Sequence, residues 1–340
     1  MGTITQSELT TRQKKLIELG DQRHFADFKQ QELIYVPKPL LLFPFPFKPV
    51  TEQSIFKIVP LHKGKVTIQY STIGKGQLPF GKDMVQFVHL FSFAFLKNQQ
   101  TLLFDTIASF TTDYEHRRPM GRIGGKDNVE LMQRIARLRD LRIMLQYEES
   151  TATVDQGKNF PDVQVIESWR LPKETTNYQV QKKRPEEESF YLRFDDSIWN
   201  ALRKRKDPLG DPVPLWAPLM RMYQNNPKAW NFVAHICWRS FTAEKAMRYG
   251  SSGISEIPLS EVSEWLGAQD SNPTRFKATL DDVLDELKVV WHEHRCSFRA
   301  GTPYREPKLI IQPPKDGVHL VRPRQFALLF QGAGFLPQKG

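Results

Sequence analysis

Residues Arg117 to Arg142 read R-R-P-M-G-R-I-G-G-K-D-N-V-E-L-M-Q-R-I-A-R-L-R-D-L-R, and this stretch decides the fold. Its glycines predict a tight turn that opens into a helix. At about 100° per residue, the large apolar residues of that helix fall on one side; they are Leu131, Met132, Ile135 and Leu138. Lys126 and Arg137 fall on the opposite side, with Arg134 at its edge. The sequence therefore predicts an amphipathic helix with one apolar and one basic face.

The same stretch is strongly basic, with eight Lys and Arg residues against three acidic ones. A helix that buries one face and presents cations on the other suits a polyanion, and the major groove of duplex DNA admits such a helix. The net charge of +10 and the pI of about 9.4 also favour an acidic partner. The alternative is a solvated amphipathic helix, which is the commoner origin of a charged face.

The elements predicted around this helix follow the order of a winged helix-turn-helix domain. They are a half-buried strand at 65–70, a core helix at 84–96, a short strand at 101–104, a short helix at 105–110, the basic helix, and two strands at 142–147 and 163–169. The last two strands would form the hairpin called the wing.

A similar order is repeated in the second half of the chain. The predicted elements are a strand at 190–194, a helix capped by Asp195 or Asp196, a rigid connector at 212–218, a long helix from 227 to about 245, a short helix at 257–267, a turn at 269–273, a third helix from 274 to about 291, and hairpin strands at 294–298 and 308–312. The two halves share this order without visible residue identity.

We therefore expect an α+β fold, mainly helical, made of two tandem winged-helix domains, each with a β-hairpin wing. The predicted divisions are an N-terminal extension at 1–60, a first winged-helix domain at 61–170, a linker at 171–189, a second winged-helix domain at 190–315 and a C-terminal tail at 316–340. Within the extension, residues 40–49 hold three prolines in six positions, which predicts an extended apolar strap rather than a helix. The strap is expected to pack over a core; the alternative is that it is held for a partner.

The cysteine content and the hydropathy pattern argue against a disulfide-rich, metal-binding, secreted or membrane protein. Cys237 and Cys296 are too few and too far apart in sequence for a disulfide framework or a thiolate metal site. The N-terminus lacks the basic and apolar regions of a signal peptide, and the most apolar helix is too short to cross a bilayer. We expect a soluble, cytoplasmic protein without a membrane contact, a metal or a cofactor.

The predicted DNA contacts fall into two groups. Those of the first domain lie at the start and along the basic face of its third helix; they are Arg117, Arg118, Arg122, Lys126, Asn128, Arg134 and Arg137. Those of the second domain lie at the start of its third helix and on its wing; they are Asn272, Thr274, Arg275, Thr279, Arg299, Tyr304, Arg305 and Lys308. Asn128 could instead be structural, and so could the helix residues of the second group. Because acids follow at 281, 282, 285 and 286, only the first turn of that later helix is expected to enter a groove.

The order and spacing of these pieces resemble the RepA-type plasmid replication initiators. The resemblance covers roughly residues 60 to 312 and is carried by Leu78-Pro-Phe-Gly81, the apolar helix, Phe110, the glycine pair 124–125, the helix with Arg134 and Arg137, Asp211-Pro-Val-Pro-Leu215, Ala229–Arg239, Ile257-Pro-Leu259, Leu266-Gly267 and Arg275-Phe276. Phe80 stands where the family pattern has tyrosine, and the region before residue 60 matches poorly.

This resemblance implies binding to repeated duplex DNA sites (iterons) at a plasmid origin, opening of adjacent AT-rich DNA, recruitment of a host helicase and repression of the protein's own promoter. It also implies monomers on the origin and homodimers when repressing. Two other functions remain open: a winged-helix repressor of a plasmid or phage, and a metal-dependent origin nickase.

The nickase alternative depends on His292-Glu-His294, which resembles the histidine pair of rolling-circle nickases. Alternation along a wing strand would place both histidines on one face, but two histidines leave a metal under-ligated. Residues 121–126 lack the Gly-Lys-Ser/Thr ending of a phosphate-binding loop. We therefore expect a protein that is not an enzyme and depends on a host ATPase.

The C-terminal tail contains Gln325-Phe-Ala-Leu-Leu-Phe330, which resembles the short peptides that bind bacterial sliding clamps. Gln325, Leu328 and Phe330 would make that contact. The alternative is an amphipathic segment that packs on its own domain.

Overall fold

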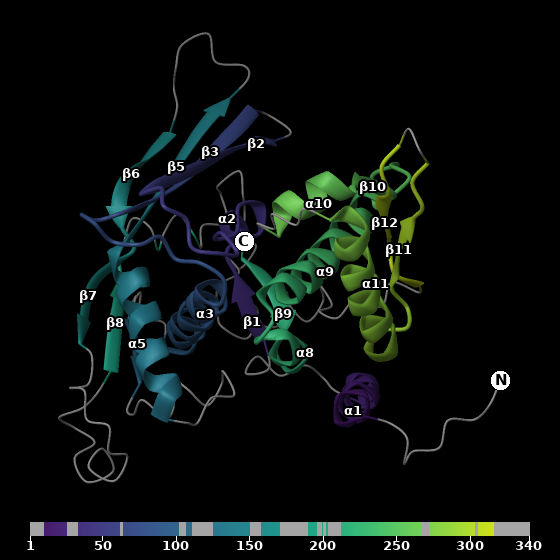
Figure 1. Ribbon diagram of the computed structural model, residues 1–340, viewed down its shortest axis with the longest axis horizontal. Coiled ribbons are helices and arrows are strands. Elements are labelled where there is room, and N and C mark those ends of the chain that lie inside the picture. The colour runs from purple at the N-terminus through teal and green to yellow at the C-terminus, as the bar shows by residue number, and fades with distance from the viewer. Residues whose placement is uncertain are drawn as a thin grey trace, which may run out of the picture. The chain divides into compact units, whose positions relative to one another are not determined.

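The computed structural model describes residues 10–25, 33–61, 64–101, 107–110, 125–149, 158–170, 190–195, 199, 202, 212–266, 272–302 and 305–315 (Figure 1). The chain forms two compact units. The middle unit is residues 34–214, and the terminal unit is built from both ends of the chain, residues 1–33 and 215–340. The chain crosses between them within strand β1 (Leu33–Val36) and strand β9 (Val213–Trp216).

The terminal unit is mainly helical with one small sheet. Its elements are α1 (Thr11–Phe25), α8 (Ala217–Tyr223), α9 (Pro227–Arg248), β10 (Ser255–Pro258), α10 (Leu259–Trp265), α11 (Pro273–Val290), β11 (Arg295–Arg299) and β12 (Lys308–Gln312). The sheet is antiparallel with the order β10-β12-β11. The helices and hairpin strands predicted between 227 and 312 are confirmed. The predicted connector at 212–218 is instead β9 followed by the start of α8.

The long helices begin where local sequence favours a helix start. Asn226 and Asn272 are the N-caps of α9 and α11, and each side chain accepts a hydrogen bond from the backbone N–H three residues on. Pro227 and Pro273 occupy the first helical positions, where no backbone donor is needed. The core that these helices and the sheet share contains Trp230, Phe232, Val233, Ile236, Phe276, Leu280, Leu284, Leu287, Leu309 and Ile311.

The middle unit combines strands with two long helices. Its described elements beyond β1 are α2 (Lys38–Leu42), β2 (Ser54–Leu61), β3 (Gly64–Thr72), α3 (Asp83–Thr101), β4 (Ile107–Phe110), α5 (Gly125–Asp140), β5 (Leu141–Glu149), β6 (Lys158–Gln164), β7 (Ile166–Arg170) and β8 (Phe190–Phe194). Strands β2 to β8 form two antiparallel sheets, with the orders β2-β3-β5-β6 and β4-β8-β7, and β1 pairs with β9 in a separate two-stranded sheet.

The helix predicted at 105–110 is wrong, because Ile107–Phe110 is strand β4. It pairs with β8 in the register Ile107 with Arg193 to Phe110 with Phe190. A four-residue segment takes its conformation from such a partner, which lies about 80 residues later and leaves no local signal.

The predicted boundary between the linker and a second domain starting at 190 is also wrong, because β8 belongs to the middle unit. Phe194 packs edge-on against Phe87 and Phe91 of α3, with ring centroids 5.9 and 6.2 Å apart. Trp199 also packs against α3, with its ring centroid 5.2 Å from that of Phe91. The core of the middle unit therefore continues beyond residue 190.

The proline-rich strap at 40–49 packs on this core as predicted, but its first residues are helical. Helix α2 tolerates Pro39 because the proline lies in the first turn, where a missing N–H costs nothing. After α2, the Phe43 ring stacks on Tyr70 at 5.0 Å, and the buried Phe45 packs edge-on against the same ring. The Tyr70 hydroxyl donates a 2.5 Å hydrogen bond to the Phe43 carbonyl. Within the described ranges, no helix combines the length and apolar character that a bilayer crossing requires.

Candidate nucleic-acid interface

The first turn of α11 presents a polar, partly cationic surface. Asn272, Thr274, Arg275 and Thr279 are all exposed, as predicted, while Phe276 faces the core. The side-chain oxygen of Asn272 accepts the capping hydrogen bond of the helix, and the Thr279 hydroxyl donates a 3.0 Å hydrogen bond to the Arg275 carbonyl. Arg275 is therefore the charged side chain best placed to reach a ligand from this turn.

The β11–β12 hairpin contributes a second cationic group. Arg299 and Lys308 are direct cross-strand partners at its outer end. Both bond the same carboxylate of β10, Glu256, at 2.9 and 3.3 Å. The hydrogen bond from Lys308 and the charge of Arg299 hold the pKa of Glu256 below its ordinary value. One acid thus aligns two cations and leaves the group with a net positive charge. The sequence did not reveal Glu256, because only the sheet register brings it to the hairpin.

The base of the hairpin loop is fixed to α10. Glu306 accepts 3.0 Å hydrogen bonds from both the backbone N–H and the hydroxyl of Ser260, at the start of α10. The loop also closes tightly, since a Cβ on Gly301 would lie 2.5 Å from the Arg305 carbonyl oxygen. Arg305 is exposed at this turn. The hairpin loop and the helices are consequently held in one arrangement, as a composite binding surface requires.

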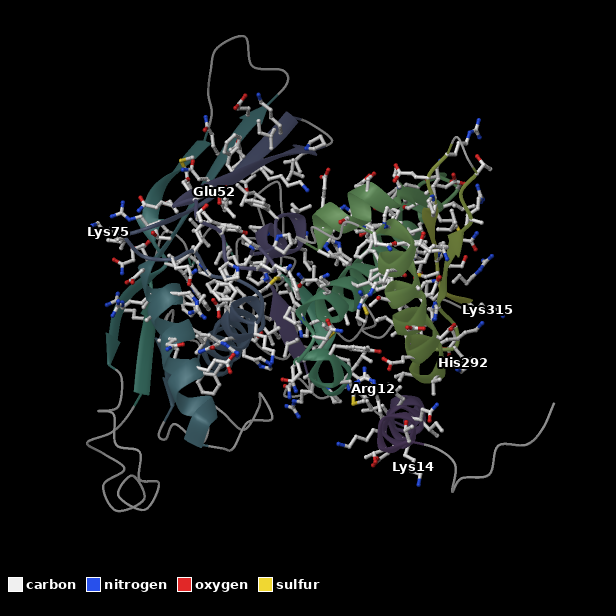
Figure 2. The ribbon with its side chains drawn as sticks, in the orientation of Figure 1. Arg12, Lys14, Glu52, Lys75, His292 and Lys315 are labelled. Atoms are coloured by element: carbon white, nitrogen blue, oxygen red, sulfur yellow. The ribbon has the colours of Figure 1, made fainter. Side chains whose placement is uncertain are left out.

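The acids of α11 are only partly free to repel phosphate. Lys277 bonds Asp281 one turn along the helix. Arg12 of α1, which is labelled in Figure 2, binds Glu286 through two hydrogen bonds of 2.5 and 2.7 Å. Its guanidinium lies 5.3 Å from the centre of the Tyr223 ring. This pairing raises the pKa of Arg12.

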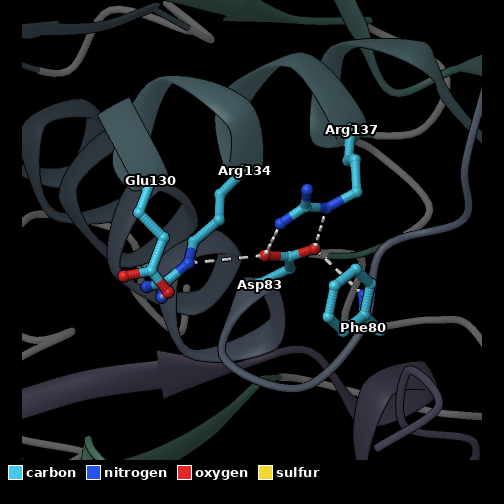
Figure 3. Close-up of polar contacts among 5 residues, drawn as sticks. All are labelled: Phe80, Asp83, Glu130, Arg134 and Arg137. Carbon is cyan, nitrogen blue, oxygen red and sulfur yellow. Dashed lines mark hydrogen bonds and ion pairs between the residues drawn. The ribbon is translucent and has the colours of Figure 1, made fainter. Parts of the chain in front are cut away.

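The basic helix of the middle unit has a different role from the predicted one (Figure 3). Asp83, at the start of α3, is completely buried and receives two hydrogen bonds from Arg137, of 2.7 and 3.0 Å. Arg134 is 4% exposed, lies 3.7 Å from the same carboxylate and bonds Glu130. The Arg137 guanidinium also covers the Phe80 ring at 4.6 Å. The prediction that Arg134 and Arg137 face DNA is therefore wrong.

The physical reason is the buried charge on Asp83. An isolated carboxylate cannot remain ionised in the interior without a partner, and two guanidinium groups of α5 supply it. The apolar side of α5 was predicted correctly for Ile135 and Leu138, which are buried. A helical wheel could not show that a second side of α5 is also covered, because Asp83 lies 54 residues before Arg137.

Several predicted contacts lie outside the described residues. These are Arg117, Arg118, Arg122, Tyr304, Gln325, Leu328 and Phe330. Lys126 and Asn128 lie in the first turn of α5, and only the backbone of that turn is described. The DNA contacts expected from Arg117, Arg118, Arg122, Tyr304, Lys126 and Asn128 remain predictions, and so does the sliding-clamp contact expected from residues 325–330.

The His292-Glu-His294 motif does not form a shared face, contrary to the prediction. His292 is exposed, whereas His294 is 8% exposed and accepts a 3.3 Å hydrogen bond from the Cys296 N–H at Nδ1. Burial lowers the pKa of His294 to about 4. Among the residues that the structure describes, no three His, Cys, Asp or Glu side chains are grouped to hold a metal ion.

Solved structures of other proteins resemble the chain, among them two of RctB domains. "Crystal structure of the RctB domains 2-3, RctB-155-483" aligns with a TM-score of 0.51 at 11% identity, covering 86% of this chain and 99% of that chain. "Crystal structure of SeMet derivatives of domain2 and domain 3 of RctB" aligns with a TM-score of 0.49 at 11% identity, covering 81% and 97%. No family model and no curated protein sequence matches the chain. At this identity, the likeness concerns the fold alone.

Proposed function

We propose that this protein is a replication initiator that binds duplex DNA at specific origin sites. The observation that carries the proposal is the architecture of the terminal unit. Its run α9, β10, α10, α11, β11, β12, with the sheet order β10-β12-β11, has the element order of a winged helix. In that reading, α11 is the recognition helix and the β11–β12 hairpin is the wing.

The charges of this unit fit such a docking. The free N–H groups and the dipole at the start of a helix attract phosphate, and Arg275 adds a full positive charge there. On the wing, Arg299, Lys308 and Arg305 would hold the backbone or enter a minor groove. The exposed acids of α11, Asp282 and Asp285, come two to three turns later. They favour insertion of the first turn alone.

An origin, rather than another DNA site, is supported by two likenesses. The sequence resembles RepA-type initiators over roughly residues 60 to 312, which spans most of both units. The fold resembles RctB domains 2-3 over 86% of the chain. The same proposal includes iteron binding, opening of AT-rich DNA and recruitment of a host helicase. It also includes a homodimer that represses its own promoter, and the lack of an enzymatic activity of its own.

Footprinting on DNA that carries the gene and its flanks tests the function. Repeated, directly oriented protected sites beside AT-rich DNA that becomes permanganate-reactive support initiation. A single inverted repeat at a promoter, without permanganate reactivity, would instead identify a repressor. Relaxation of supercoiled DNA in Mg²⁺ or Mn²⁺ would identify a nickase.

Substitution on the hairpin tests the interface. Arg299→Ala removes a cation at the outer end of β11, whereas Arg295→Ala removes the same side chain at the inner end and is the matched control. With roughly six to ten phosphate contacts, wild-type affinity should fall about 10³–10⁵-fold between about 50 and 200 mM salt. Arg299→Ala should reduce the salt slope by about one. An unchanged slope for Arg299→Ala, or an equal reduction for Arg295→Ala, would contradict the wing assignment.

A further inference from the structure

The end of α9 and the turn before β10 expose three large apolar side chains, which we call the α9 patch. Met247 is 50%, Tyr249 81% and Ile254 48% exposed. Single exposed apolar residues are ordinary, but three within eight residues around one turn form a local apolar surface. Such a surface on a soluble unit is a candidate docking site.

The backbone under the patch is well defined. The turn depends on Gly250 and Gly253, with φ of +86° and +67°, a region that other residues rarely adopt. Gly250 N–H bonds the Met247 carbonyl at 3.1 Å, which closes the end of α9. The apolar side chains therefore project from a fixed turn.

The described chain ends beside this patch. A Cβ on Gly253 would lie 3.1 Å from the Met247 Cβ and 3.1 Å from Pro313 Cγ, so Gly253 lies against both residues. Two residues later, the Lys315 N–H donates a 2.8 Å hydrogen bond to the Glu293 carbonyl. The tail that follows Lys315 thus starts within a few residues of the α9 patch.

The tail carries an uncharged apolar segment, Phe326-Ala-Leu-Leu-Phe330, that begins eleven residues after Lys315. Eleven residues of random coil span about 18 Å on average, and about 35 Å when fully extended. The segment can therefore reach the patch without strain. A short tether also gives it an effective concentration of about 1 mM at the patch, which no free partner of ordinary abundance matches.

We propose that Phe326–Phe330 folds back and covers the α9 patch of its own chain. Burial of the phenylalanine rings against Met247, Tyr249 and Ile254 removes apolar surface of both partners from water. The docked segment is then withheld from any other protein with an apolar groove, so the tail is a masked binding peptide. This inference is independent of the proposed DNA contacts.

Hydroxyl-radical footprinting of the full-length chain tests the docking, because methionine and tyrosine side chains report their own exposure. With a tethered affinity of about 100 µM, the patch would be covered about nine-tenths of the time. Phe326→Asp with Phe330→Asp should then raise modification of Met247 and Tyr249 by up to about tenfold. Phe335→Asp places one such charge in the tail outside the segment and should leave both rates unchanged.

The reciprocal change, Tyr249→Asp, should accelerate hydrogen exchange in residues 326–330. Equal footprints in wild type and the double variant would overturn the proposal. Protection that disappears on dilution, together with a loss of dimer mass in light scattering, would also overturn it, since the occupant would then be a second copy. The tail substitutions lie outside the described core, and circular dichroism checks that the fold is retained.

Discussion

Removing the charge of Asp83 should destabilise the middle unit strongly. Asp83→Asn keeps the size of the side chain but leaves Arg134 and Arg137 facing a neutral amide. Asp83 is fully buried and Arg134 is 4% exposed, so water cannot replace the lost partner. Breaking a buried ion pair by removing one partner costs about 3–5 kcal/mol, and we expect a loss of that size in the free energy of unfolding.

Native-state hydrogen exchange of α3 and α5 amides, measured against urea, isolates the middle unit. Asp140→Asn is the matched control, because Asp140 pairs with Arg139 where both side chains are partly exposed, and exposed pairs contribute about 0–1 kcal/mol. A cost for Asp83→Asn no larger than that of Asp140→Asn would refute the structural role of the cluster. Arg137→Met gives a second measure: weaker DNA binding at unchanged stability would restore the basic face of α5 as a DNA surface.

Two further predictions concern the terminal unit. Burial lowers the pKa of His294 to about 4, from an ordinary value near 6.5. Between these values the unfolded chain binds more protons than the folded one, so stability should fall as pH decreases from about 6.5 to about 4, by at most about 3 kcal/mol. His294→Gln should flatten that decline in urea titrations, and an unchanged slope would contradict the burial of a neutral imidazole. At the N-terminus, Arg12→Ala should speed hydrogen exchange throughout α1, with a cost of about 0.5–1 kcal/mol because the pair with Glu286 is partly exposed. Lys14→Ala, an exposed neighbour on the same helix, is the control, and equal effects would show that Arg12 does not hold α1 on α11.

Local signals predicted the helices of the terminal unit well. Asn226 and Asn272 before a proline mark helix starts, and the spacing of Phe276, Leu280, Val283, Leu284 and Leu287 fixes the buried side of α11. These signals lie within one or two turns of the residues they organise, so a single sequence contains them.

The predictions that failed in the middle unit concern residues whose partners lie far away in the sequence. Strand β4 depends on β8, which follows about 80 residues later, and the same pairing moves residues 190–194 out of the predicted second domain. In the candidate interface, the same limit hid Glu256, whose partners Arg299 and Lys308 lie 43 and 52 residues away. For the same reason, the sequence did not show that Arg134 and Arg137 pair with the carboxylate of Asp83. Charge on a helix face shows that a partner is needed, but not whether that partner is DNA or a carboxylate of the same chain.

The division of the terminal unit between the two ends of the chain has a consequence for biosynthesis. Arg12 and Glu286 are 274 residues apart. At about 5–20 residues per second, a ribosome needs roughly 14–55 s to make the second after the first. Throughout that interval the nascent α1 has no α11 to dock on, while residues 34–214 emerge completely and are free to fold. The order of translation therefore favours folding of the middle unit before the terminal unit can close, and the apolar side chain of Leu16 stays exposed until α11 has been synthesised.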